Sequence, residues 1–242
     1  MSMKLFFKMR YVPALLFILM AAPTAHAAAT SPSLGTAASY SVLAGTSVTN
    51  SGATTISGDV GISPGAALPP NVTGWGSVTL LGTLNDANGA ALTAQGDRDL
   101  AFSALGSQGC DTTFAGAFKE LAGETLVPGV YCATSFHLTT GTLTLNGGIA
   151  DVWVFKSASD LIVTGASAKV LMTSGGQPCN VWWRVVSGAS LSASSIFVGN
   201  ILAGTSITFG TGASLDGRAL ASTALVSLLG NSISGPTCAP AP

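Results

Sequence analysis

One short motif in this chain has the residue types and spacing of a hydrolase nucleophile. Gly61-Ile62-Ser63-Pro64-Gly65 matches G-x-S-x-G, the strained turn that exposes the catalytic serine of α/β-hydrolases. That turn needs a helix after it and a histidine base downstream, but the next residues, AALPPNVTG, resist helix formation. His137 is the single histidine after residue 27, and a lone histidine usually packs or faces solvent. We therefore interpret the motif as a turn that leaves a strand.

Two aspartates have the potential to form a second kind of catalytic site. Asp59 and Asp216 occupy comparable points of two similar segments, and paired carboxylates carry out glycoside hydrolysis. Each adjoins a glycine, however, and aspartate beside glycine more often bonds the local backbone of a turn. The sequence also lacks phosphate-binding loops, metalloprotease helices and calcium loops. We expect a protein that is not an enzyme and that needs no cofactor or metal.

The repeated phrases in the chain indicate the elements that hold its side chains. LAGTSVT at 43–49 returns as LAGTSIT at 202–208, and a degraded copy begins at Leu220, eighteen residues after the second. Short strand-like pieces recur in three rows, with glycine or serine at nearly every junction. The first row contains 152–156, 181–186, 200–203 and 218–221; the second 159–163, 189–193, 205–209 and 224–228; the third 166–172, 195–199, 213–217 and 231–234. Strands at this period predict a β-solenoid whose coils stack into one core. We expect the segment with the first LAGTS copy to form a rung beside the C-terminal coils.

Alternation within the strands predicts which side chains face solvent. Ile207 and Phe209 should point inward, which leaves Ser206 and Thr208 outside. The outward positions are rich in serine and threonine and nearly free of charge, although natural sheets normally use charge against edge pairing. A flat grid of methyls and hydroxyls, with periods of roughly 4.8 Å between rungs and 6.7 Å along a strand, can order water into an ice-like array. Our predicted ice-contacting set in the second row is Ser47, Thr49, Thr139, Ser190, Ser192, Ser206, Thr208 and Ser227, and a less favoured set is Thr55, Thr144, Thr211 and Ser214.

The first predicted row is apolar on both sides of its strands and therefore needs a cover. The segment 86–105 has small residues at helical spacing, with Gly106 and Gly109 beyond it as a stop. Its inward positions would be Ala87, Ala91, Ala94, Ala101 and Leu105. We predict a helix over 86–105 that covers this row, followed by an excursion over 106–132 that caps the solenoid.

The four cysteines bear on the oxidation state and the metal content of the protein. An even number in an exported protein favours two disulfides with three possible pairings, and the cysteines are too far apart for a zinc knuckle. Cys110 and Cys132 flank the predicted excursion, whereas Cys179 precedes a buried strand and Cys238 ends the final coil. We predict the pairs Cys110–Cys132 and Cys179–Cys238.

The first 27 residues have the pattern of a secretory signal peptide. Basic residues precede a short apolar run, and Ala25-His26-Ala27 forms an A-x-A cleavage site. We expect cleavage near Ala27, a single domain over 28–242, and a protein secreted to the extracellular space or periplasm. Charged residues make up only 8% of the chain, against roughly 25% in typical soluble proteins. This composition excludes the basic surface of a nucleic-acid-binding protein, and we expect a monomer with no membrane partner.

Three blocks of the chain carry a family resemblance. SLGTAASYSVLAGTSVTNSGATTISGDVGISPG at 33–65, LAGETLVPGVYC at 121–132 and FVGNILAGTSITFGTGASLDGRALAS at 197–222 resemble the widespread microbial ice-binding (antifreeze) protein family. The resemblance implies a mainly β fold: a discontinuous right-handed β-solenoid, triangular in section, with one long α-helix packed along one face. It also implies a non-enzymatic protein that binds the ice crystal surface, depresses the freezing point modestly and inhibits recrystallisation.

The resemblance is less specific about which face contacts ice. The family's T-A/G-x-T/N-like motifs are best matched by Thr211-Gly212-Ala213-Ser214 and Thr164-Gly165-Ala166-Ser167, each with serine in the last position. Two other classes fit a solenoid. A surface adhesin usually has many more repeats and an anchor, and a polysaccharide-acting enzyme would need a groove of acidic and basic residues.

Overall fold

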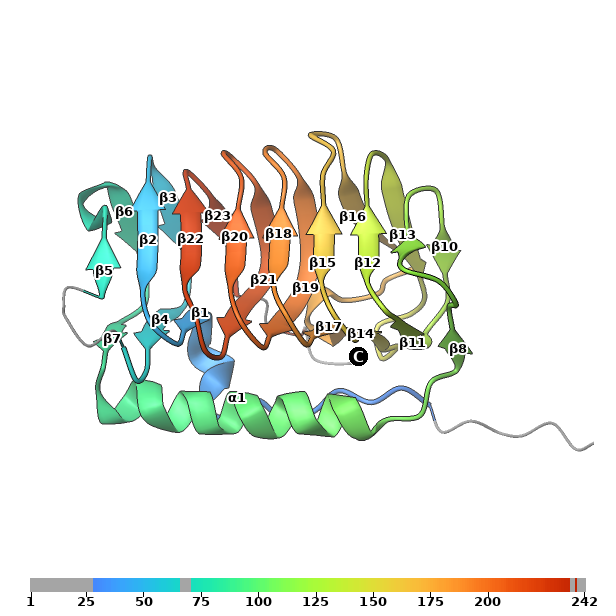
Figure 1. Cartoon of the computed structure of the whole chain (residues 1–242), viewed down its shortest axis with the longest axis horizontal. Helices are drawn as coiled ribbons and strands as arrows, with labels where there is room; N and C mark the ends of the chain where they lie inside the picture. The colour runs from blue at the N-terminus through green and yellow to red at the C-terminus, as the bar shows by residue number, and fades with distance from the viewer. Residues whose placement is uncertain (1–27, 66–70, 236–237, 239–242) are drawn as a thin grey trace, which may run out of the picture.

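The computed structural model describes residues 28–65, 71–235 and 238 as a stack of short parallel strands flanked by one long helix (Figure 1). The strands follow the chain in a repeating three-step cycle, so that each coil adds one strand to each of three rows. An 8-stranded sheet forms row two, and a 15-stranded sheet contains rows one and three. All of the pairings are parallel, as the predicted β-solenoid requires.

The three rows have the following members. Row one contains β1 (Tyr40–Ala44), β4 (Asp59–Ile62), β7 (Leu84–Asp86), β8 (Thr112–Thr113), β11 (Gly129–Ala133), β14 (Trp153–Ser157), β17 (Val181–Val185) and the second halves of β19 (Ile196–Ala203) and β21 (Ser214–Ala221). Row two contains β2 (Val48–Ser51), β5 (Val72–Thr73), β9 (Lys119–Glu120), β12 (Phe136–Leu138), β15 (Leu161–Val163), β18 (Ala189–Leu191), β20 (Ile207–Phe209) and β22 (Val226–Leu229). Row three contains β3 (Thr54–Ile56), β6 (Val78–Leu80), β10 (Thr125–Leu126), β13 (Thr142–Asn146), β16 (Lys169–Thr173), the first halves of β19 and β21, and β23 (Ser232–Ile233). The strand rows predicted from the repeat are confirmed.

The N-terminal coils stack on the last C-terminal coil, which explains the repeated phrase. Strands β1, β2 and β3 pair with β21, β22 and β23 in register. The leucines of the three LAGTS copies consequently lie side by side, since Leu202 pairs with Leu220 and Leu220 pairs with Leu43. Each copy satisfies the same neighbour contacts, and the predicted rung is confirmed.

One glycine is required where row three turns into row one. Gly199 has a φ of +108° and pairs with Gly217 on the next coil. A Cβ at Gly199 would lie 2.8 Å from Cβ of Val181, which is closer than side chains pack. The backbone can therefore turn here within a continuous strand, and β19 and β21 each run through the corner.

The interior of the solenoid is an apolar core with an aromatic stack. Phe155 and Trp183 lie 4.0 Å apart between ring centroids, and Tyr131 and Phe197 extend the stack on either side. A second apolar cluster lies on the outer side of row one, where Leu43, Val154, Trp182, Leu202 and Leu220 are buried. Row one is thus apolar on both sides, as its sequence predicts.

The cover over row one is helix α1 (Gly89–Ser107), together with the N-terminal segment 28–39 (Figure 1). The helix begins later than predicted because Asp86 still belongs to β7 and Asn88 caps it, its Oδ1 accepting the N–H of Ala91 at 3.0 Å. Ala87 therefore lies outside the helix, contrary to the prediction, whereas the four other predicted inward residues are buried. The N-terminal segment contributes Leu34 and Ala37, a contribution that the sequence pattern did not indicate.

Residues 106–132 depart from the prediction of an excursion. Their strands β8, β9 and β10 pair in register with β11, β12 and β13, so they form the terminal coil of the solenoid. These strands have two residues each, too few for alternation to show in the sequence. The remaining elements are the short 3₁₀ helices η1 (Gly35–Ser39), η2 (Trp75–Ser77) and η3 (Pro178–Asn180).

The cysteines pair as predicted, Cys110 with Cys132 and Cys179 with Cys238. Within the described part of the chain, no helix is long and apolar enough to cross a membrane. The predicted signal peptide falls on residues 1–27, outside the described residues.

Candidate functional site

The strand register of row two places one outward residue from each strand in a single line. A second outward pair, Ser51 of β2 and Leu229 of β22, lies beside this line. The line runs Thr73, Thr49, Ser227, Thr208, Ser190, Ile162, His137 and Glu120, one from each strand of the sheet from β5 to β9. The first five residues all carry hydroxyls, and we call them the hydroxyl column. Inward neighbours such as Ile207 and Phe209 are almost completely buried, so each hydroxyl is held on a strand anchored in the core. Adjacent strands of a sheet lie about 4.8 Å apart, which sets the spacing along the column.

The structure brings most of the predicted ice-contacting set to this face. Thr49, Ser190, Thr208 and Ser227 belong to the hydroxyl column. Ser47 and Ser206 precede their strands, where the backbone oxygen of each accepts an N–H from the next coil. Thr73 was missed because Val72–Thr73 is only two residues long, although the alternation of an inward valine with an outward threonine is present.

Two members of the predicted set lie at the corner after the strand. The Ser192 hydroxyl donates to the Gly165 carbonyl at 2.7 Å, which turns it toward the neighbouring coil. Thr139 follows β12, and its backbone N–H donates to Glu120 at 3.1 Å. Both residues border the face rather than extend the column.

The other end of row two has different chemistry. Phe118 stacks on His137 with ring centroids 4.1 Å apart, and its side chain is half exposed. Burial disfavours the charged form of Glu120, but N–H groups of Ala122, Thr139 and Leu121 donate to its carboxylate and hold its pKa below the usual value. A charged carboxylate and an exposed ring interrupt any regular array of hydroxyls, so the uniform part of the face ends at β18.

A shallow hollow marks this boundary. It encloses about 190 Å³ and is lined by Asp160, Ile162, Gly188, Ser190, Ser206 and Thr208, among others. Gly188 has no side chain to fill the space between neighbouring coils, and the Asp160 carboxylate accepts the Gly188 N–H at 3.2 Å. The hollow therefore lies over the end of the hydroxyl column, where Ser190 adjoins Ile162.

Row three is also open to solvent, but its surface is less uniform. Thr55 lies between Ser232 and Thr79, and Ser214 lies between Ser232 and Ile196. Ile196 is 54% exposed and pairs with Lys169, while Leu171, 48% exposed, lies beside Thr144. Thr211 is exposed at the corner between rows two and three. Thr144 and Ser214 therefore each adjoin a large apolar side chain, whereas Thr55 has a hydroxyl-bearing neighbour on both sides.

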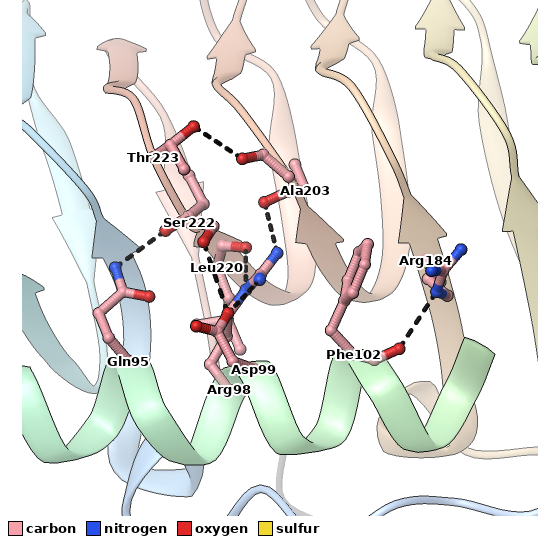
Figure 2. A network of polar contacts seen from close by, with 11 residues as sticks. Gln95, Arg98, Asp99, Phe102, Arg184, Ala203, Leu220, Ser222 and Thr223 are labelled. Carbon is pink, nitrogen blue, oxygen red and sulfur yellow. Dashed lines mark hydrogen bonds and ion pairs between the residues drawn. The ribbon is translucent and has the colours of Figure 1, made fainter. Parts of the chain in front are cut away.

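Row one is covered by α1, and polar side chains bridge the helix and the coils (Figure 2). Arg98 is only 2% exposed and donates to the carbonyls of Ala203 and Leu220 at the corners of two coils. Gln95 donates to the Ala221 carbonyl at 3.0 Å, and Arg184 of β17 donates to the Phe102 carbonyl of the helix at 3.1 Å. Sequence pattern gave no sign that Gln95 and Arg98 face inward.

The candidate catalytic residues are not brought together. Ser63 is buried after β4 of row one, and its N–H donates to the Ala44 carbonyl at 3.0 Å, whereas His137 lies in row two near the opposite end of the stack. Asp59 and Asp216 lie in different rows, and each carboxylate accepts a hydrogen bond from the adjacent coil, from the Thr83 N–H and the Ser234 hydroxyl, respectively. In the described ranges, no group of three or more histidine, cysteine, aspartate or glutamate residues could hold a metal ion.

The comparisons with known proteins agree with this architecture. An ice-binding-like family model matches residues 42–234, which is most of the chain. The chain belongs to the ice-binding protein family. An ice-binding protein of Flavobacterium frigoris is 36% identical over 134 residues, covering 55% of this chain and 48% of that protein. The chain thus matches about half of this relative's length.

Two solved structures resemble the whole solenoid. An ice-binding protein from an Antarctic biological consortium superposes with a TM-score of 0.80 at 36% identity, covering 86% of this chain and 92% of that one. An ice-binding protein of the Antarctic ascomycete Antarctomyces psychrotrophicus gives a TM-score of 0.78 at 33% identity, covering 86% of this chain and all of that one. The predicted family and the mainly β solenoid fold are therefore confirmed.

Proposed function

We propose that this protein adsorbs to ice through row two and so inhibits ice growth and recrystallisation. The observation that carries the proposal is the hydroxyl column, five residues in register on five adjacent strands. Ice offers neither a pocket nor a charge, so binding must sum many weak contacts over a flat area. From β5 to β18, row two carries no charged side chain and its exposed large apolar side chain is Leu229, whereas row three carries Lys169, Leu171 and Ile196.

Rigidity supports the same choice of face. Binding through ordered water requires that the surface hold its geometry, because mobility would cost entropy on every contact. Inward residues of row two such as Val48, Ile207 and Val226 are fully buried, which fixes the strands that carry the column. The contact area comprises the hydroxyl column, with Ser47 and Ser206 beside it. Ser192 and Thr139 border it, and Thr55, Thr144, Thr211 and Ser214 lie outside it.

We further propose that the protein acts as a secreted monomer without enzymatic activity. The A-x-A pattern before Ala28 supports removal of a signal peptide near Ala27. The two disulfides support an oxidising compartment, because such bonds persist mainly outside the cytosol. Residues 28–242 would then be one mature ice-binding domain.

A tyrosine substitution at the centre of the column tests the proposed face. Thr208→Tyr should lower thermal hysteresis several-fold, because the larger side chain holds the surrounding hydroxyls away from the crystal. Thr208 is exposed, so the melting temperature should not change. Ser214→Tyr on row three is the matched control and should retain most of the activity.

The outcome separates the two open faces. Full activity in Thr208→Tyr with loss of activity in Ser214→Tyr would assign the contact to row three. Full activity in both variants would contradict ice adsorption through either face. Ice-crystal shaping under a nanolitre osmometer gives an independent measurement on the same samples.

A further inference from the structure

The far end of the solenoid has a pocket next to the start of the described chain. The pocket encloses about 320 Å³, and its lining includes Ala28, Ala29, Asp111, Gly129 and Asp151. It lies beside β8 and β11, on the opposite end of the molecule from β5, β6 and β7 (Figure 1). Neither ice face includes any of these residues.

The N-terminal segment is held firmly up to this pocket. Gln108 binds both backbone groups of Thr30, its Oε1 accepting the N–H at 2.9 Å and its Nε2 donating to the carbonyl at 2.8 Å. The Ser31 hydroxyl accepts the indole N–H of Trp182 at 2.9 Å, and Ala29 packs against the second apolar cluster. The backbone at residue 28 is thus placed at the pocket by the two or three residues that follow it.

The charged residues in the pocket lining are both acidic. Asp111 uses Oδ2 to accept the Val130 N–H at 2.7 Å, and Asp151 uses Oδ2 to accept the Gly148 N–H at 2.7 Å. Within the described part of the chain, neither Oδ1 atom has a hydrogen bond, and neither carboxylate forms an ion pair. The titratable neighbour on β11 is Tyr131, whose pKa is raised by burial and then by the charge of Asp111. The pocket therefore presents negative charge without a cation to balance it.

We propose that this pocket is the docking site for the amino terminus created by signal-peptide removal. Hydrolysis of the Ala27–Ala28 peptide bond, with water as co-reactant, leaves a carboxylate on Ala27 and an ammonium on Ala28. The new ammonium pairs with Asp111 and Asp151 at the site where residue 28 is already held. The uncleaved precursor has an uncharged amide nitrogen at this position, so export completes an ion pair that the precursor lacks. This inference rests on the proposed cleavage and is independent of ice binding.

The ion pair makes the α-amino group of Ala28 harder to deprotonate. A free α-amino group has a pKa of about 7.7–8.0, and neighbouring carboxylates favour its charged form and so raise this pKa. A pKa raised in the folded state adds stability that is fully present below the unfolded pKa and is lost as the pH rises through the folded pKa. Stability should consequently fall above about pH 8 in the cleaved protein.

The experiment uses the full chain, expressed with its signal and collected after export. Intact mass and N-terminal sequencing first establish where the mature chain begins, which we expect to be Ala28. Reductive methylation with ¹³C-formaldehyde keeps the amine basic, and NMR then follows its titration. We expect a pKa at least about 0.5 above that of the unfolded protein treated in the same way.

Isosteric variants identify the partners of the amine. Asp111→Asn and Asp151→Asn retain an oxygen for the backbone N–H and should each lower the pKa of the amine toward the unfolded value. Asp216→Asn, on row three, is the control and should leave that pKa unchanged. An amine at Ala28 with an ordinary pKa, or with a pKa insensitive to both variants, would refute the pairing. A mature chain that begins at another residue would refute the cleavage on which the pairing depends, and ice activity would be unaffected in either case.

Discussion

Arg98 shows how a single charged side chain can join two parts of this fold. It carries a guanidinium into a nearly dry site, where burial lowers its pKa, and the neighbouring Asp99 lies 2.6 Å from its Nη1. The side chain also lies over the ring of Phe102, 4.7 Å from the centroid. Its donors are directed at the carbonyls of Ala203 and Leu220, and the Ala203 carbonyl also accepts the Ser222 N–H of the next coil at 2.9 Å. Arg98 thus joins the helix to two neighbouring coils through hydrogen bonds to their carbonyls.

Replacing Arg98 should therefore destabilise the protein markedly. Arg98→Ala leaves the Ala203 and Leu220 carbonyls without this donor and removes packing beneath α1, so we expect the free energy of unfolding to fall by about 3 kcal/mol. Lys169→Ala, an exposed cation on row three, should change it by less than about 0.5 kcal/mol. Urea titration followed by tryptophan fluorescence measures both. Equal stabilities for the two variants would show that the buried guanidinium is dispensable.

At the scale of elements, α1 depends on small residues to approach row one. Ala94 is completely buried between the helix and the coils, whereas Ala104 is exposed on the same helix. Ala94→Arg should lower the free energy of unfolding by more than about 3 kcal/mol, because the site has neither room nor a partner for the charge. Ala104→Arg is the matched control and should cost less than about 0.5 kcal/mol. A normal melting temperature for Ala94→Arg would contradict the packing described for α1.

The sequence predicted the elements wherever a pattern repeats over several residues. The in-phase copies of LAGTS located the rows and their register, and the spacing of Ala91, Ala94 and Ala101 located the helix. Arg98 was not predicted to be buried, because its carbonyl partners are more than a hundred residues away and their orientation is set by corners. The two-residue strands of the terminal coil are likewise too short for the alternation of inward and outward residues to be recognised in the sequence. The sequence predicted the residues on the central strands of the candidate site. It did not predict those at the two ends of row two, because Thr73 and Glu120 belong to such short strands.

At the scale of the whole molecule, each disulfide joins a residue outside the strands, Cys110 or Cys238, to the row-one side of the solenoid. Cys179–Cys238 closes a separation of 59 residues and Cys110–Cys132 one of 22. In the chain-entropy model, loops of this size stabilise the fold by about 4 and 3 kcal/mol, respectively. Both bonds lie on the row-one side of the fold, away from the hydroxyl column, so they should affect stability and not the ice contact.

Paired alanine variants test this separation. Cys179→Ala with Cys238→Ala should lower the melting temperature more than Cys110→Ala with Cys132→Ala, and both should retain thermal hysteresis near 0 °C. Differential scanning calorimetry and osmometry on the same samples provide the two measurements. Loss of hysteresis in a variant that is still folded would show that a disulfide shapes the ice-contacting face.

Because the first coils stack on the last coil, the hydroxyl column can form only late in synthesis and export. Thr49 and Ser227 are neighbours in the hydroxyl column, yet most of the chain lies between them in sequence. The complete column cannot form on an emerging polypeptide until β22 has left the ribosome or the export channel. Pairings between such distant residues also form slowly. The proposed ice-contacting surface is therefore assembled only after β22 has been released, and a chain truncated before β22 would lack the centre of this surface.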